Sequence, residues 1–208
     1  MKQEGNSKKM EENLLQKIQQ DLKQTLSQKR YLHSIGTMKL AEELAKQYHI
    51  NPEEAALTGL AHDMAKELPK EERIKYIEEN YIPIDEIEAK NTGLLHAKIG
   101  AHMAKTKYGF SESMQKAIAY HTTGSPDMDT LAKIIFIADK AEETRNYEDI
   151  ETVRTLAKKD LDQCVLYILD FTIKQNIDKK KAIHPNSILT RNKILLQINN
   201  SINALHNT

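Results

Sequence analysis

The sequence predicts an all-α protein, a helical bundle that carries an extra helix at its N-terminus. Its 208 residues include only 7 glycines and 5 prolines, so long stretches lack the residues that interrupt helices. Along these stretches the apolar residues recur at the three- and four-residue spacing of a helix face rather than at the alternating spacing of a strand. The chain length fits one domain or two small ones.

Capping residues mark where several of these helices begin and end. Asn51 followed by Pro52 combines an N-cap residue with a proline suited to the first helical turn. Gly109 can end a helix in the left-handed conformation, and Ser111 can begin the next one. We expect helices over residues 10–27, 28–48, 51–63, 68–83, 94–108, 111–121, 131–141, 153–177 and 185–205.

Charge divides the chain into two parts. Residues 1–28 are rich in charged side chains and have only one weakly apolar stripe, so we expect a charged, partly helical N-terminal extension. Residues 29–208 contain the other expected helices and are predicted to form a single body. We find no internal repeat and no low-complexity segment that would divide this body further.

The composition excludes several functional classes. Thirty basic and thirty acidic residues cancel, which argues against a dedicated nucleic-acid binder. The longest apolar run, residues 134–138, is far shorter than the about 20 residues of a membrane span. The N-terminus has no apolar centre typical of a secretory signal, and Cys164 has no partner for a disulfide. We therefore expect a cytoplasmic protein that binds neither nucleic acid nor membranes; a homodimer remains open.

Four residues at or within apolar helices occur in the order H…HD…D: His33, His62, Asp63 and Asp139. A single histidine on a helix is more often a packing or capping residue, but the four together suit a divalent metal. Two imidazoles and two carboxylates balance the charge of the ion and leave positions for water and a phosphate oxygen. The pattern therefore predicts a metal site for hydrolysis at phosphorus.

This order resembles that of the HD-domain metal-dependent phosphohydrolases, and further segments narrow the resemblance. The segments GLAHDMAK (59–66), LLHA (94–97), HTTG (121–124), AD (138–139) and IHP (183–185) resemble the YqeK-like bacterial HD proteins, as do Arg30 and Arg145. The resemblance covers residues 29–200 and does not include residues 1–28. The sequence departs from the family pattern at residues 140–144, where an IEP-like run is expected. This departure bears on the shape of that loop and not on the metal site.

The resemblance implies an HD-domain helical bundle that cleaves diadenosine tetraphosphate symmetrically to two ADP. It also implies binding of iron and of purine nucleotides. We expect a mononuclear or dinuclear divalent centre, with iron first and Mn, Co or Zn as alternatives. Two other readings remain: a hydrolase of other nucleotides or cyclic dinucleotides, and a non-catalytic nucleotide-sensing module.

Two further histidines, His96 and His121, lie between the HD pair and Asp139. In some HD proteins such histidines hold a second metal, with the aspartate of the HD pair, here Asp63, bridging the two ions. Alternatively, they bind phosphate or protonate the leaving oxygen. The residues that we expect to act in catalysis are Asp63, His62, Lys66, His96 and His121.

Cationic and polar residues near these motifs are candidates for nucleotide binding. Arginine suits bidentate phosphate recognition, so Arg30 and Arg145 are expected to contact phosphate, although either could be a surface residue. Lys66, one turn from His62, is expected to bind phosphate, support Asp63 or remain solvated. The predicted nucleotide-binding residues are Arg30, His96, Thr122, Arg145, His184 and Asn186.

Overall fold

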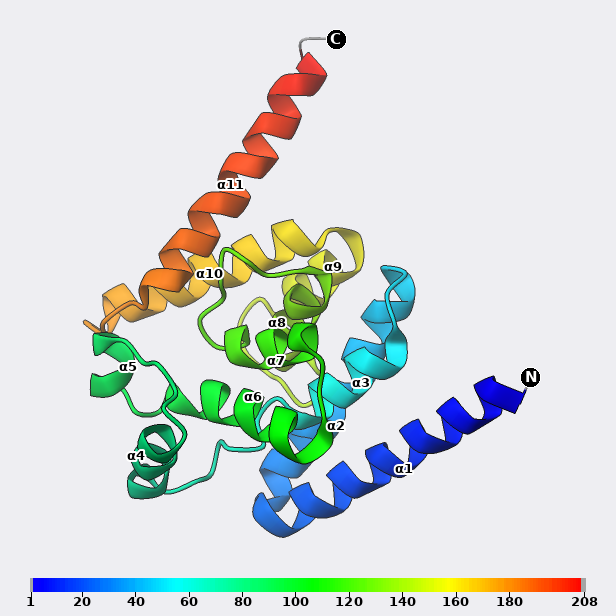
Figure 1. The fold of residues 1–208 in the computed structure, drawn as a ribbon. Coiled ribbons are helices and arrows are strands. Elements are labelled where there is room, and N and C mark those ends of the chain that lie inside the picture. The colour runs from blue at the N-terminus through cyan, green and yellow to red at the C-terminus, as the bar shows by residue number, and fades with distance from the viewer. Residues whose placement is uncertain (1, 207–208) are drawn as a thin grey trace.

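The computed structural model describes the backbone of residues 2–206 and the side chains of residues 13–200. The described residues form eleven helices and no strand, which confirms the predicted all-α fold (Figure 1). The helices are α1 (Lys2–Thr25), α2 (Gln28–Gln47), α3 (Pro52–Ala61), α4 (Lys70–Glu79), α5 (Glu86–Lys90), α6 (Leu95–Tyr108), α7 (Glu112–Tyr120), α8 (Thr130–Ala141), α9 (Ile150–Lys159), α10 (Leu161–Asp178) and α11 (Pro185–His206).

Helix α8 lies at the centre of the bundle. It packs against α2, α7 and α10, and the residues on nearly all of its faces are buried. A helix that is apolar all round is stable only inside a core. Because α8 also carries Asp139, the buried helix brings a carboxylate into the middle of the fold.

The capping residues act as expected. The Asn51 side chain accepts hydrogen bonds from the amides of Glu53 and Glu54, and the Ser111 hydroxyl accepts one from the amide of Met114. Gly109 ends α6 with a φ of 70°. These caps fix the ends of three neighbouring helices that lead into the site.

The single helix expected over residues 153–177 is wrong, because the structure divides this region into α9 and α10. Asp160 separates them: its backbone is extended, and its carboxylate accepts hydrogen bonds from the amides of Asp162 and Gln163. The capping residue therefore overrides the continuous amphipathic pattern. The short helix α5 was also not expected; Asp85 and Glu88 stabilise it through a capping box.

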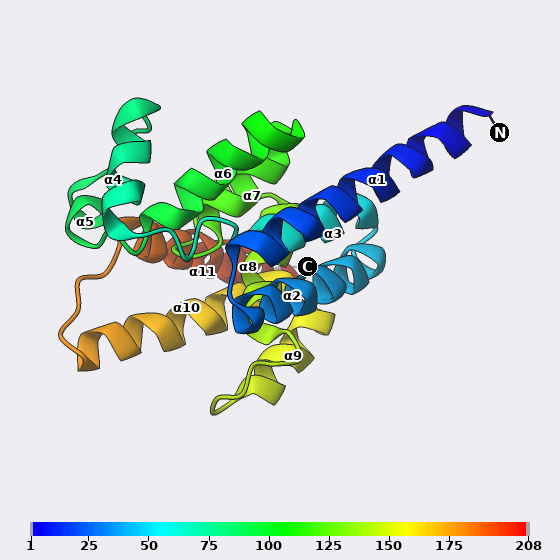
Figure 2. The ribbon, with the colours of Figure 1, turned by 90° about the horizontal axis from the view of Figure 1, so that it is seen from below.

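Helix α1 packs on the body and is longer than expected, since it begins at Lys2 (Figure 2). Ile18, Leu22 and Leu26 are buried in the main core, and the Tyr108 hydroxyl donates a hydrogen bond of 2.7 Å to Asp21. The division at residue 28 into extension and body stays a prediction. Within the described residues, no helix is both long and apolar enough to cross a membrane.

Candidate active site

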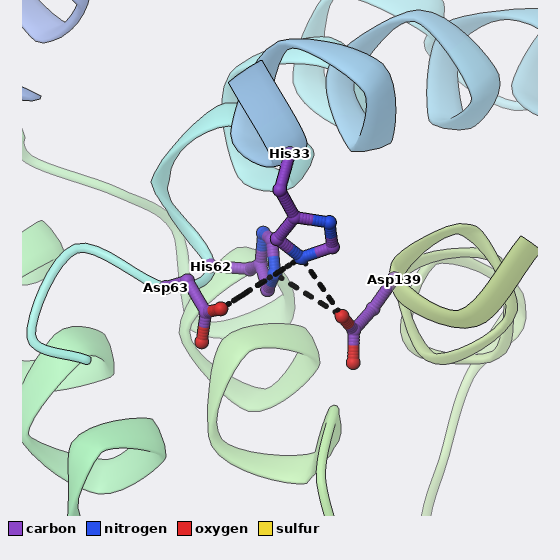
Figure 3. A group of neighbouring side chains, drawn as sticks. All are labelled: His33, His62, Asp63 and Asp139. Atoms are coloured by element: carbon purple, nitrogen blue, oxygen red, sulfur yellow. Dashed lines mark hydrogen bonds and ion pairs between the residues drawn. The ribbon is translucent and has the colours of Figure 1, made fainter. Parts of the chain in front are cut away.

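The four residues of the predicted metal site converge from three helical regions (Figure 3). His33 comes from α2, His62 and Asp63 from the turn that follows α3, and Asp139 from α8. The Oδ1 atom of Asp139 lies 3.0 Å from Nε2 of His33 and 3.5 Å from Nε2 of His62. All four residues are buried, so their donor atoms face a small enclosed centre.

A second group shares Asp63 with the first. His96, from α6, places Nε2 at 3.1 Å from Oδ1 of Asp63, and His121, after α7, places Nε2 at 3.4 Å from the same oxygen. The other carboxylate oxygen, Oδ2, lies 3.5 Å from Nε2 of His62. Asp63 therefore presents one oxygen to each group, as a bridging ligand would.

Each histidine of the site is oriented by a contact of its outer ring nitrogen. The Nδ1 atoms of His62, His96 and His121 lie 2.6–2.7 Å from the backbone carbonyl oxygen of the residue three positions earlier. A carbonyl oxygen only accepts, so Nδ1 carries the proton in each of these rings. When such a ring is neutral, its Nε2 atom keeps a lone pair that points into the site, which is the tautomer that a metal requires.

The donor set fits a cation. The Nε2 atoms of His33 and His62 lie 3.2 Å apart, and those of His96 and His121 lie 3.1 Å apart. Two lone pairs at this distance repel unless a proton or a metal ion is shared between them. Among the described residues, the buried Oδ1 atom of Asp63 also lacks a hydrogen-bond donor. The cluster is therefore compatible with binding of a divalent metal.

The electrostatics of the centre favour ionised carboxylates. Burial alone raises the pKa of Asp63 and Asp139, but the charges of His62 and Lys140, respectively, and the close histidine rings hold both pKa values well below the usual range. Burial alone lowers the pKa of His62, but the two carboxylates raise it to about 9. Burial lowers the pKa of His121 to about 4, so this ring is neutral at pH 7.

Two of the predicted cations flank the HD pair. The Nη1 atom of Arg30 donates a hydrogen bond of 2.8 Å to Oδ2 of Asp63. The Nζ atom of Lys66 lies 3.2 Å from Nε2 of His96 and 4.0 Å from Oδ1 of Asp63. Both side chains are partly exposed, so each joins the buried centre to the surface.

Arg145 and Lys140 both contact Asp139. The Nη2 atom of Arg145 donates a hydrogen bond of 2.7 Å to Oδ1 of Asp139, and its Nε donates to the backbone carbonyl of the same residue. Lys140 donates to Oδ2 of Asp139 and to the backbone carbonyl of His121. Burial lowers the pKa of Lys140.

Sequence reasoning missed two of these contacts. Lys140 and Glu142 belong to the stretch that departs from the family pattern, and both touch the site. The Oε1 atom of Glu142 lies 3.0 Å from Nδ1 of His33, the one site histidine whose outer nitrogen does not contact a carbonyl. The only signal was their closeness in sequence to Asp139, which does not distinguish them from ordinary residues at a helix end.

Three predicted nucleotide contacts lie beside the centre rather than in it. Thr122 directly follows His121 and is partly exposed. The Nε2 atom of His184 lies 2.8 Å from Oδ2 of Asp85, and its Nδ1 accepts a hydrogen bond from the backbone amide of Asn186.

The start of α11 is attached to the turn that follows His121. The Ser187 hydroxyl donates a hydrogen bond of 2.8 Å to the backbone carbonyl of Thr123. Gly124, with a φ of 72°, lets Thr190 approach the same turn closely. These contacts hold the region of His184 next to the loop that carries His121.

Comparison with known proteins agrees with the resemblance to HD-domain proteins that the sequence motifs indicate. The sequence model of the HD domain matches residues 30–144. A relative from Halalkalibacterium halodurans, named symmetrical bis(5'-nucleosyl)-tetraphosphatase, is 38% identical over 87% of this chain and 97% of its own. A Bacillus subtilis relative of the same name is 34% identical over 82% of this chain and 92% of its own.

A solved structure supports the fold independently. The crystal structure of a protein from Clostridium acetobutylicum, described as a predicted HD superfamily hydrolase involved in NAD metabolism, superimposes with a TM-score of 0.85. The two sequences are 38% identical, over 88% of this chain and 97% of the other. The chain therefore belongs to the HD domain family, which confirms the resemblance inferred from its motifs.

Proposed function

We propose that the protein is a metal-dependent hydrolase that cleaves diadenosine tetraphosphate symmetrically to two ADP. The observation that carries the proposal is the pair of buried ligand groups that share Asp63, with cationic side chains at their rim. The names of the relatives support the substrate and the symmetry of cleavage. Such a combination suits the hydrolysis of a phosphoric anhydride, because metal ions and cationic side chains stabilise the negative charge on the phosphate oxygens in the transition state.

The residues of the first group are proposed to hold the metal: His33, His62, Asp63 and Asp139. When bound, a divalent metal supplies an activated water and polarises a phosphoryl group. Iron is our first candidate, with Mn, Co and Zn as alternatives, since imidazole and carboxylate together suit all four.

His96 and His121 have two proposed roles. With Asp63 they hold a second ion, because their three donor atoms lie within 4.8 Å of one another. Alternatively, they contact the phosphate or protonate the leaving oxygen. To act as an acid in this way, the ring must first take up a proton on Nε2. Lys66 is close enough to His96 to supply positive charge in either case.

The substrate is proposed to lie across the rim of the centre. Arg30 and Arg145 bind phosphate oxygens, and Lys140 adds a charge that the sequence did not indicate. Thr122, His184 and Asn186 contact the nucleotide on the α11 side. Water adds to one central phosphorus, and the bond between that phosphorus and the bridging oxygen breaks. The bridging oxygen leaves on the other central phosphate, so each product carries two phosphates.

Product analysis tests this function. Protein supplied with Fe(II), Mn(II) or Co(II) is incubated with diadenosine tetraphosphate, and the nucleotides are separated by chromatography. ADP as the sole nucleotide product supports the proposal, whereas ATP together with AMP contradicts symmetrical cleavage. A panel of other nucleotides and cyclic dinucleotides shows whether another substrate is preferred.

A variant assigns the turnover to the proposed site. Asp63→Ala removes the bridging carboxylate, so turnover should be lost while the helical circular-dichroism signal persists. Asp63→Asn keeps the side-chain shape and controls for effects on packing. Activity retained in both variants would remove Asp63 from the mechanism.

We further infer a cytoplasmic location, because the one cysteine is buried and unpaired and the proposed substrate is a nucleotide. We also propose that the chain can form a homodimer. Cell fractionation with an antibody tests the location, and light scattering of the full chain tests the oligomeric state.

A further inference from the structure

Symmetrical cleavage of a dinucleoside tetraphosphate sets a geometric requirement. The bond that breaks lies between the two central phosphates, so an identical nucleoside extends on each side of the reacting centre. One nucleoside is accounted for by the proposed contacts with Thr122, His184 and Asn186. The other needs a separate cavity on the far side of the metal ligands.

A cavity of about 360 Å³ lies at this position. Asp139, Lys140 and Arg145 line one end of it, so it adjoins both a proposed metal ligand and a proposed phosphate contact. Its volume falls within the ~300–1,000 Å³ typical of small-molecule sites. Residues of α9 and α10, among them Val153, Phe171 and Gln175, line the rest of it.

Two aromatic side chains, Tyr147 and Phe171, form part of the cavity wall. The rings of Tyr147 and Phe171 are stacked, with centroids 6.0 Å apart and planes inclined by 29°. Both side chains are partly exposed and line the cavity. Aromatic side chains of this kind are the usual platform for a purine ring, because every base has a π-face.

The position of Tyr147 is fixed relative to the catalytic centre. Its hydroxyl donates a hydrogen bond of 3.0 Å to the backbone carbonyl of Lys140, the residue after Asp139. Burial raises the pKa of Tyr147 to about 12, so the ring is uncharged near pH 7. A neutral aromatic ring is therefore attached to the same helix end that supplies a metal ligand.

Polar groups complete the cavity at its exposed edge. Gln175, one turn beyond Phe171 on α10, offers an amide donor and acceptor, and Asp149 offers a carboxylate. An amide can pair with the edge of a purine, and a carboxylate can accept hydrogen bonds from ribose hydroxyls. The wall, the edge and the cationic end together match the three parts of a nucleotide: base, ribose and phosphate.

We propose that this cavity binds the second nucleoside of the dinucleoside polyphosphate. The purine lies against Tyr147 and Phe171, and the phosphate chain passes Arg145 to reach the metal ligands. This inference rests on the proposed function, and it adds a specificity site formed by α9, α10 and the loop before α9. The cavity explains how a single centre distinguishes a substrate with two nucleosides from one with a single nucleoside.

Steady-state kinetics on two substrates tests the proposal. Phe171→Ala removes the stacking surface, so KM for diadenosine tetraphosphate should rise about ten-fold, with kcat changed by less than about three-fold. Adenosine 5'-tetraphosphate has one nucleoside, which can occupy the α11 side, so its KM should change less than about two-fold. An unchanged KM for diadenosine tetraphosphate, or an equal rise for both substrates, would overturn the proposal.

Two further variants guard against a folding effect. Gln175→Ala changes an exposed position without removing packing, and it should raise the same KM in the same selective way. Tyr81→Ala removes an aromatic ring that is 92% exposed and does not line the cavity, so it should leave both substrates unaffected.

Calorimetry with ADP separates this inference from the proposed function. In the presence of Mn(II), the wild-type protein should bind two ADP molecules per chain, and Phe171→Ala should bind one at the same concentration. This result does not depend on turnover. If the activity assay showed no release of ADP from diadenosine tetraphosphate, only the proposed function would be contradicted. If calorimetry showed one ADP per chain in both proteins, the second subsite would be overturned.

Discussion

Glu142 holds the outer face of His33, with Oε1 of the carboxylate 3.0 Å from Nδ1 of the ring. Burial alone raises the pKa of Glu142, but hydrogen bonds from His33 and Thr144 bring it below the usual range. Gly36, one turn after His33 on α2, makes the contact possible, because a Cβ atom there would overlap the Glu142 carboxylate. The inner nitrogen of His33 is thus oriented by an acid 109 residues away.

Glu142→Ala should weaken metal binding about 10–100-fold, the usual effect of removing a group that orients a histidine ligand. The ring would lose both its orientation and the negative charge that makes Nε2 a better donor. Titration of the metal-free protein with Mn(II) or Co(II) measures the change in Kd. Glu143→Ala, which removes an exposed acid next in sequence, is the matched control. Equal Kd values in both variants would contradict the role of Glu142.

His121→Ala should retain one equivalent of metal and lose at least about 100-fold in kcat, a loss in the range of general acid catalysis. The four residues proposed to hold the first ion do not include His121, so they should still bind it in this variant. Plasma emission spectrometry of anaerobically purified protein gives the stoichiometry. Loss of all metal would place His121 in the first group.

The same measurement decides between the two roles proposed for His96 and His121. Two equivalents of metal in the wild-type protein and one in His121→Ala indicate a second ion. One equivalent in both proteins indicates contact with phosphate. His102→Ala is a suitable control, because this histidine lies on the same helix as His96 but its ring contacts the Tyr76 hydroxyl.

The four residues of the proposed metal site could be identified from sequence because few residue types bind such ions and their order is informative. His62 and Asp63 also follow a capped helix, so both side chains can turn toward one point. Glu142 could not be predicted, since acids near helix ends are common and its partner lies on α2. The break at Asp160 was missed because a side-chain cap overrode an unbroken apolar pattern.

Leu22→Ala should lower the free energy of unfolding by about 2–5 kcal/mol, the usual cost of a buried leucine truncation. The Leu22 side chain is 1% exposed within the main core, although it belongs to the charged N-terminal segment. Urea denaturation of the full chain measures the effect. Leu196→Ala, at a position 63% exposed, should change stability by less than about 0.5 kcal/mol. A comparably small effect at Leu22 would mean that α1 is an independent extension.

Cys164 should be unreactive in the folded protein. Burial, with a contribution from the charge of Asp160, raises the pKa of its thiol to about 12. At pH 8 such a thiol is about one part in ten thousand thiolate, and only the thiolate reacts with a disulfide reagent. Its sulfur also lies 3.5 Å from the backbone carbonyl of Val153, in the packed contact between α9 and α10.

Titration with a coloured aromatic disulfide gives the test. In native protein the labelling rate should be very low and should rise about ten-fold per pH unit between pH 7 and 9. The reason is that the thiolate fraction of a thiol with this pKa keeps rising throughout that range and does not level off. In urea the single thiol should react at once, with a plateau near its ordinary pKa of about 8.5. Rapid labelling of native protein, or a plateau below pH 9, would show that α9 and α10 separate readily. That result would also weaken the second nucleoside subsite, since these two helices form the wall of its cavity.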